Sequence, residues 1–171
     1  MEYLILAPPV LMPAEPPSGA FTLAAALAGH GREVALLDLS VAFFHRLLDG
    51  GLLAGPGLAG ALAYLRDRVG GYEPMTHRSA TGVLHRRLGG FGDRFPGWKL
   101  TLMDVVSPAR LHDPAAMAAA LAAGPSPFQD LWEDVLDPVL RQHRPREIWI
   151  SLAYLSQLPA TLDLVGHLRR Q

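Results

Sequence analysis

The residues of this sequence best placed for chemistry are Ser18, Asp38 and His45. Ser18 precedes an Ala-rich helical segment, and the first turn of a helix offers unpaired N–H groups to an anion. Asp38 ends an apolar run, where dinucleotide-binding folds carry a ribose-binding acid. We favour structural roles for all three: Ser18 as a helix cap, Asp38 as a cap or turn residue, and His45 as a half-buried helix histidine.

Motifs that mark common active sites are missing. The sequence contains no G-x-S-x-G and no G-x-x-x-x-G-K-[ST], and no G-x-G-x-x-G follows the first predicted strand. A hydrolase nucleophile elbow, a phosphate-binding loop and a dinucleotide fingerprint at that strand are therefore excluded. No two of the 7 histidines have the four-residue spacing, with a carboxylate, of a helical zinc site. We predict no catalytic residue and no metal ligand in this chain.

The composition narrows the partners that the chain can have. With 15 basic and 16 acidic residues the formal net charge is −1, so no strong field attracts nucleic acid or an anionic membrane. Cysteine is absent, which excludes disulfides, thiolate metal sites and an iron–sulfur cluster held by this chain. No apolar stretch approaches the roughly 20 residues of a membrane span. We expect a cytoplasmic protein, with a residue bias typical of high-GC bacterial genes.

The elements that would position these residues begin with a β-α-β unit. Tyr3–Ala7 is an unbroken apolar run, typical of a strand buried on both faces of a parallel sheet, and Pro8 ends it. Phe21–Ala28 is a helix rich in Ala and Leu, and Val34–Leu37 is the second apolar strand. Right-handed units of this kind place loops at the carboxyl ends of their strands, where open α/β sheets bind ligands.

Further along the chain, helical patterns dominate. Ile148–Leu152 is a third strand, and Leu100–Val106 is either an edge strand or an extended connection. Pro138 is expected to kink the longest helix. The predicted helices after the second strand are Ser40–Asp49 with Ser40 as its cap, Leu58–Val69, Thr81–Leu88, Ala115–Ala123 opened by Asp113-Pro114, Phe128–His143 and Thr161–Arg170.

These elements predict a single α/β domain over residues 1–171. Its fold class is Rossmann-like: a three-layer αβα arrangement with a mainly parallel sheet, truncated after the third or fourth strand. A mostly helical insertion at about 50–145 separates the second strand from the third. Doubly wound sheets usually have five or six strands, so we expect the amino-terminal fragment of a longer protein. An unpaired sheet edge would then favour a homodimer.

Three segments near the two ends of the chain resemble a known family. They read L-I-L-A-P-P, P-P-S-G-A-F-T-L-A-A-A-L-A-G-H-G-R-E-V-A-L-L-D-L-S and I-W-I-S-L-A-Y-L-S-Q-L. Their order is similar to that of the amino-terminal cobalamin-binding-type domain of radical S-adenosylmethionine (radical SAM) enzymes. Those domains commonly have a strand ending in prolines, a P-x-x-G turn into an Ala/Leu helix, G-x-x-V, an acid after the second strand and a strand ending in serine.

The resemblance implies a cofactor site in the loops at the carboxyl ends of the strands. Cobalamin is the implied ligand, because polar side chains and backbone amides there would hold the corrin amides while small residues admit the ring. The D-x-H-x-x-G motif that supplies a cobalt ligand is missing after the second strand. The implied cofactor-binding residues are Pro8, Pro9, Ser18, Gly19, Asp38, Ser40, Ser151, Tyr154, Ser156 and Gln157.

Radical chemistry itself is not expected of this chain. The C-x-x-x-C-x-x-C motif that binds the family's [4Fe-4S] cluster is absent. The resemblance therefore implies that the cluster and S-adenosylmethionine belong to a carboxyl-terminal radical SAM domain in cis. The present chain would position a cofactor, or a peptide or small-molecule substrate, for that partner domain.

Two other interpretations stay open. A proline loop after the first strand and Gly29-His30 before the second also occur in the amino-terminal half of nucleotide-sugar glycosyltransferases, although the paired glycines usual in their first loop are missing. A non-enzymatic Rossmann-like interaction module is the other, with Trp132 and Trp149 serving only the core. The sequence that follows this chain would separate the three: a cysteine triad, a second nucleotide-binding unit or a stop.

Overall fold

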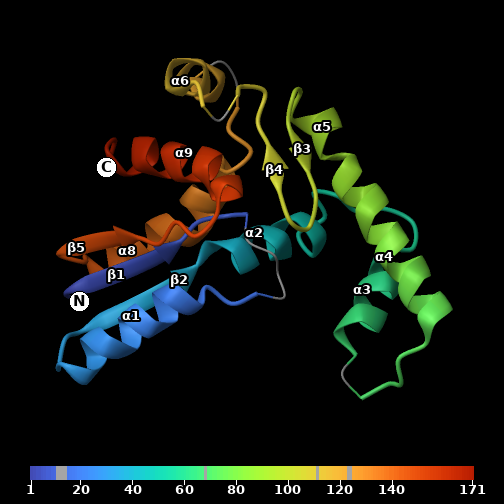
Figure 1. Cartoon of the computed structure of the whole chain (residues 1–171), viewed down its shortest axis with the longest axis horizontal. Helices are drawn as coiled ribbons and strands as arrows, with labels where there is room; N and C mark the ends of the chain where they lie inside the picture. The colour runs from blue at the N-terminus through green and yellow to red at the C-terminus, as the bar shows by residue number, and fades with distance from the viewer. Residues whose placement is uncertain (11–14, 68, 111, 123–124) are drawn as a thin grey trace.

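A small parallel sheet organises this mixed α/β fold. The computed structural model describes residues 1–10, 15–67, 69–110, 112–122 and 125–171. The sheet has three strands in the order β2-β1-β5, and they are β1 (Tyr3–Ala7), β2 (Val34–Asp38) and β5 (Glu147–Ile150). Figure 1 shows them at the left of the molecule, with their carboxyl ends toward its middle.

The first strand lies at the centre of the sheet, as its unbroken apolar run predicts. All pairing is parallel, and the register places Leu6 beside Leu37 of β2 on one side and beside Ile150 of β5 on the other. Leu4 and Ile5, which alternate between the two faces of the strand, are both fully buried. Helices must therefore cover both faces of the sheet at β1.

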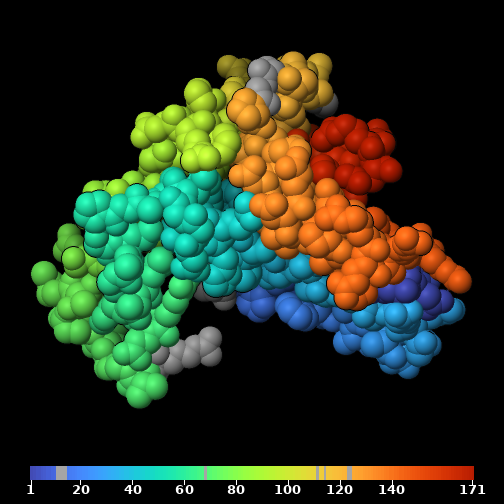
Figure 2. All heavy atoms as spheres, turned by 180° about the vertical axis from the view of Figure 1, so that it is seen from behind, coloured from blue at the N-terminus to red at the C-terminus, as the bar shows by residue number. Residues whose placement is uncertain are grey.

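The two connections between the strands pass over opposite faces of the sheet. α1 (Ser18–Gly29) joins β1 to β2 and packs against both strands. The longer connection from β2 to β5 returns on the other side of β1, and its last helical segment, residues 129–143, covers the opposite face (Figures 1 and 2). The strand order thus reverses between β1 and β5, and that point is the topological switch point of the sheet.

Most of the connection from β2 to β5 is helical. α3 (Leu58–Arg66) and α4 (Pro74–Gly89) pack against each other and project away from the sheet, at the right of Figure 1. After β5 the chain forms the short 3₁₀ helix η2 (Leu155–Gln157) and then α9 (Leu158–Leu168). The elements between β2 and β5 are α2 (Leu39–Leu48), α3 (Leu58–Arg66), α4 (Pro74–Gly89), α5 (Phe91–Arg94), β3 (Lys99–Leu100), β4 (Val105–Val106), α6 (Pro114–Ala122), α7 (Gln129–Leu131), the π-helix η1 (Trp132–Leu136) and α8 (Asp137–His143).

The segment Leu100–Val106 is neither an edge strand of the main sheet nor an extended connection. It forms most of a small antiparallel hairpin in which β3 pairs with β4. The turn closes locally, because the hydroxyl of Thr101 accepts hydrogen bonds from the N–H groups of Met103 and Asp104 at 3.1 and 2.9 Å. The hairpin is a separate two-stranded sheet, and these side-chain bonds stabilise its turn.

The kink predicted at Pro138 takes the form of a π-helical turn. α7, η1 and α8 follow one another without a break, and Pro138 is the second residue of α8. Proline has no N–H to donate and its ring crowds the preceding turn, so the backbone there cannot keep regular i→i−4 bonds. The widened turn directly before it relieves that conflict.

Capping groups decide where α4 and α6 begin. α4 begins at Pro74 rather than near residue 81, because the Glu73 side chain accepts hydrogen bonds from the N–H groups of Met75 and Thr76. α6 begins at Pro114 as predicted, after Asp113. The predicted end of that helix, residues 123–124, lies outside the described residues.

The main core gathers aromatic side chains between the sheet and the helices. Trp132 is fully buried, and Phe128 packs against Phe43 and Trp98 with ring centroids 5.4 and 5.8 Å apart. Trp149 is half-buried and packs edge-on against Tyr3, so it is not part of this cluster. None of the helices in the described ranges is long and apolar enough to cross a membrane.

Candidate functional site

A crevice of about 520 Å³ lies at the carboxyl ends of β1 and β5, at the switch point of the sheet. Its walls come from two loops, one after each strand, that are far apart in the sequence. Open α/β sheets bind their ligands at this place, because the loops there diverge and leave a cleft between them. The lining residues are Glu15, Pro16, Pro17, Ser18, Gly19, Ser151, Leu152, Ala153, Tyr154 and Gln157.

Gln157 holds the two loops together. Its side chain is buried, and its Oε1 accepts hydrogen bonds from the N–H groups of Ala153 and Tyr154 at 2.8 and 3.1 Å. Its Nε2 donates to the carbonyl of Pro8 at 2.6 Å, across from the β5 loop to the β1 loop. Ser156 adds a second link, since its hydroxyl donates to the carbonyl of Val10 at 3.1 Å. These two side chains set the width of the crevice.

The polar groups of the lining besides Gln157 are hydroxyls, backbone amides and the carboxylate of Glu15. The Tyr154 hydroxyl is 3.3 Å from the carboxylate of Glu15, and the two residues join the walls at the rim. The first i→i−4 bond of α1 runs from the N–H of Phe21 to the carbonyl of Pro17. The N–H groups of Gly19 and Ala20 come before this bond in the chain, so they have no i→i−4 partner within the helix. They lie at the positive end of the helix dipole.

Gly19 lines the crevice and has open space beside it. A methyl group added there would meet no atom within 4 Å. Ser18 begins α1 but does not cap it as expected: Pro17 is the residue before the helix, and no side chain caps that end. Proline is already fixed near a helical φ, so the turn forms without a capping hydroxyl.

The other candidate residues lie outside the lining. Pro8 and Pro9 are buried behind the crevice, where Pro8 receives the Gln157 amide. Asp38 starts α2 in place of Ser40: its Oδ1 accepts hydrogen bonds from the N–H groups of Ser40 and Val41, both at 3.0 Å. Asp38 therefore has the capping role that its position favoured, and Ser40 is buried in the first turn.

His45 is exposed rather than half-buried. Its Nδ1 lies 2.8 Å from Oδ2 of Asp49. The two carboxylate oxygens of Asp49 also accept hydrogen bonds from Arg66, at 2.9 and 2.8 Å. The hydrogen bonds from Arg66 and then from His45 lower the pKa of Asp49 to about 2. The histidine thus belongs to a surface ion pair, one turn from the end of α2.

A G-x-G-x-x-G string does occur at Gly55–Gly60, but it follows α2 and opens α3 instead of following a strand. The Arg87 guanidinium occupies the space beside Gly55 and donates to the carbonyl of Pro56 at 2.9 Å. This is not the strand–loop–helix context of a dinucleotide site. The residues that the structure describes also include no group of three or more His, Asp or Glu placed to hold a metal.

Comparisons with other proteins do not identify the chain. No family model, curated protein or solved structure matches it.

Sequence reasoning missed two features. Glu15 lines the crevice, although only its place in a proline-rich loop hinted at a role. A second cavity of about 830 Å³ lies elsewhere in the molecule, with residues from five helices, and no motif announces it. Among the described residues that line the crevice, hydroxyls and amides outnumber titratable groups, and none is a histidine. Such a site is suited to holding a polar ligand.

Proposed function

We propose that this chain is a Rossmann-like module that positions a small-molecule cofactor or substrate for a catalytic domain. The observation that carries this proposal is the crevice at the switch point, where the loops after β1 and β5 meet. Gln157 holds these loops in place before any ligand arrives, and a preformed site loses less entropy on binding.

Cobalamin is the first ligand to test. The corrin ring carries amide side chains, and the crevice offers partners for them: the Ser151 and Tyr154 hydroxyls, and the backbone amide of Gly19. The residues present would therefore fit the amide side chains of the cofactor, but the described lining has no imidazole that could bind cobalt. A cobalamin held there would depend on its amides, and would supply its chemistry to a radical SAM domain that follows in cis.

The rim of the crevice also supports contact with a partner. Large apolar side chains beside it are exposed to solvent: Leu155 is 70% exposed and Leu152 is 46% exposed. Phe21, one turn into α1, is 51% exposed. A carboxyl-terminal domain or a bound macrocycle would bury these side chains, which contributes about 25 cal/mol for each Å² removed from water.

The test is retention of hydroxocobalamin. The full-length protein is incubated with the cofactor and desalted, and the corrin absorbance of the protein fraction is measured. Gly19 lines the crevice, so Gly19→Leu places a large side chain in it without a backbone clash, whereas Gly29→Leu adds the same side chain at the other end of α1, outside the lining. We expect retention by the wild type and by Gly29→Leu and its loss in Gly19→Leu.

Other outcomes point elsewhere. No retained absorbance in the wild type would reject the cobalamin proposal. Heat on titration with UDP-glucose, abolished by Gly19→Leu, would then favour the amino-terminal domain of a nucleotide-sugar glycosyltransferase. Binding of neither ligand would leave the non-enzymatic interaction module, with the apolar rim as its contact surface.

A further inference from the structure

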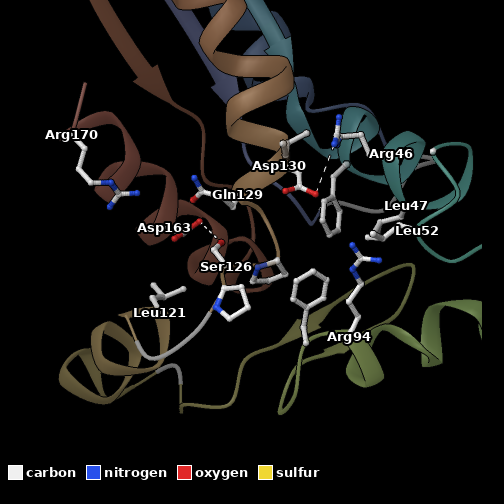
Figure 3. Close-up of a pocket in the computed structure, with 16 residues that line it drawn as sticks. Arg46, Leu47, Leu52, Arg94, Leu121, Ser126, Gln129, Asp130, Asp163 and Arg170 are labelled. Carbon is white, nitrogen blue, oxygen red and sulfur yellow. Dashed lines mark hydrogen bonds and ion pairs between the residues drawn. The ribbon is translucent and has the colours of Figure 1, made fainter.

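The second cavity, of about 830 Å³, is lined by residues of α2, α5, α6, α7 and α9 and of the turns beside them. Among the described residues, none lines both this cavity and the crevice. Figure 3 shows Arg46 and Arg94 on one side of the space, Asp163 and Arg170 on the other, and Ser126 and Gln129 between them. Its volume is within the range of small-molecule sites.

The two carboxylates of the lining already have partners. Asp163 accepts a hydrogen bond from the Ser126 hydroxyl at 2.6 Å and another from the Trp132 indole at 2.7 Å. Asp130 lies 4.0 Å from the guanidinium of Arg46. Arg46 is held more firmly by Asp134 at 2.7 Å. Asp163 is therefore satisfied within the protein, and Asp130 faces the positive charge of Arg46.

The other two cations among the described lining residues are Arg94 and Arg170. Within the described ranges, neither Arg94 nor Arg170 has a carboxylate within ion-pair distance. Arginine presents a planar set of donors that matches a carboxylate or a phosphate, and it stays charged at every physiological pH. In Figure 3 the Arg94 guanidinium extends toward Leu47 and Leu52 and into the space, whereas Arg170 lies at the opposite end.

The rest of the wall is mainly apolar. Phe43, Leu47 and Leu131 are buried members of the core that reach the cavity with one side. Phe95 and Leu121 are half-buried and complete the floor. An apolar surface beside an unpaired guanidinium matches a molecule that has an apolar body and one anionic group.

We propose that this cavity binds a small amphipathic anion, with Arg94 contacting its carboxylate or phosphate group and the half-buried Leu52, Phe95 and Leu121 contacting its apolar body. This inference does not depend on the ligand of the crevice. Charge complementarity favours the anion over a neutral lipid or an amine, because Asp163 is hydrogen-bonded within the protein and Asp130 faces Arg46, whereas Arg94 has no carboxylate partner among the described residues.

The proposal is tested by calorimetric titration of the full-length protein with four probes of equal chain length: octanoate, octyl phosphate, octan-1-ol and octylamine. We expect one of the anions to bind at least about ten-fold more tightly than the alcohol, as for a charge-assisted hydrogen bond. Comparing octanoate with octyl phosphate tells which anionic group the site takes. Equal affinity for the alcohol, or tighter binding of the amine, would overturn the proposal.

Matched variants locate the binding. Arg94→Gln removes the charge from an exposed side chain and should weaken anion binding about ten-fold, while Arg86→Gln removes an exposed arginine of α4 outside the cavity and should not change it. Leu121→Trp should fill the floor and weaken every probe. Thermal unfolding of each variant checks that it folds. Unchanged octanoate affinity in folded Arg94→Gln would rule the site out.

Discussion

Replacing Gln157 with leucine should open the crevice and destabilise the whole domain. The substitution keeps a side chain of similar size but makes it apolar, and it removes three hydrogen bonds: two within the loop after β5 and one from that loop to the loop after β1. The carbonyl of Pro8 is buried and would lose its partner, which costs about 1–3 kcal/mol. The N–H groups of Ala153 and Tyr154 belong to exposed residues and can turn to water, so their loss adds about 0.5 kcal/mol each.

The sum is a loss of about 2–4 kcal/mol from the free energy of unfolding. In a domain of this size that lowers Tm by about 10 °C. Urea denaturation and a thermal scan both measure it, and Gln142→Leu on the exposed face of α8 is the matched control, expected to change stability by about 0.5 kcal/mol at most.

Gln157→Glu tests the accepting and donating ends of the side-chain amide separately. The carboxylate still accepts from the Ala153 and Tyr154 amides, but it places a charge against the Pro8 carbonyl and raises its own pKa. A raised folded pKa favours the protonated form, so this variant should regain stability as pH falls. If Gln157→Leu unfolds within about 0.5 kcal/mol of the wild type, the loops do not depend on this side chain and the reasoning is wrong.

Three further predictions follow from local contacts. Asp38→Ala removes the cap of α2 and should cost about 1 kcal/mol in urea denaturation, whereas Asp38→Asn should keep most of it. The pKa of Asp49 is lowered, so its ion pair stabilises the fold above about pH 3.8 and loses this effect as pH falls toward about 2; Arg66→Gln should raise the Asp49 pKa in an NMR titration, and an unchanged value would contradict the pairing. Because β2 and β5 are the outer strands of the described sheet, light scattering should show a mass that rises with concentration, and a constant monomer mass would argue against edge pairing.

Local pattern was sufficient for many elements of the fold. The strand Tyr3–Ala7 has the predicted bounds, and α1 ends near Gly29, followed by Gly31 at φ +74°, a conformation that glycine reaches without strain. Asp113-Pro114 opens its helix as predicted. In each case the deciding interaction lies within a few residues, so the amino-acid order alone carries the information.

Contacts between distant segments were decided only by the tertiary structure. The pairing of β5 with β1 brings Ser18 and Gly19 to the same crevice as Ser151 and Tyr154, although the middle of the chain separates them. Sequence patterns named these residues and also Gln157, but as a cofactor-binding residue; they did not predict that its amide bonds the two loops, because a glutamine has no local signature for a buried long-range role. The exposure of His45 was likewise misjudged, since only packing decides which side of a helix the core covers.

Local sequence patterns could not predict the second cavity either. Arg94 and Asp163 become neighbours of one space only when α2, α5, α6, α7 and α9 pack around it. Sequence by itself determined the α/β class, the parallel strands and the loops that follow them, because strand and turn preferences depend on near neighbours. Long-range packing decides which side chains share a cavity and which charges in it lack a partner. Only the folded structure therefore reveals them.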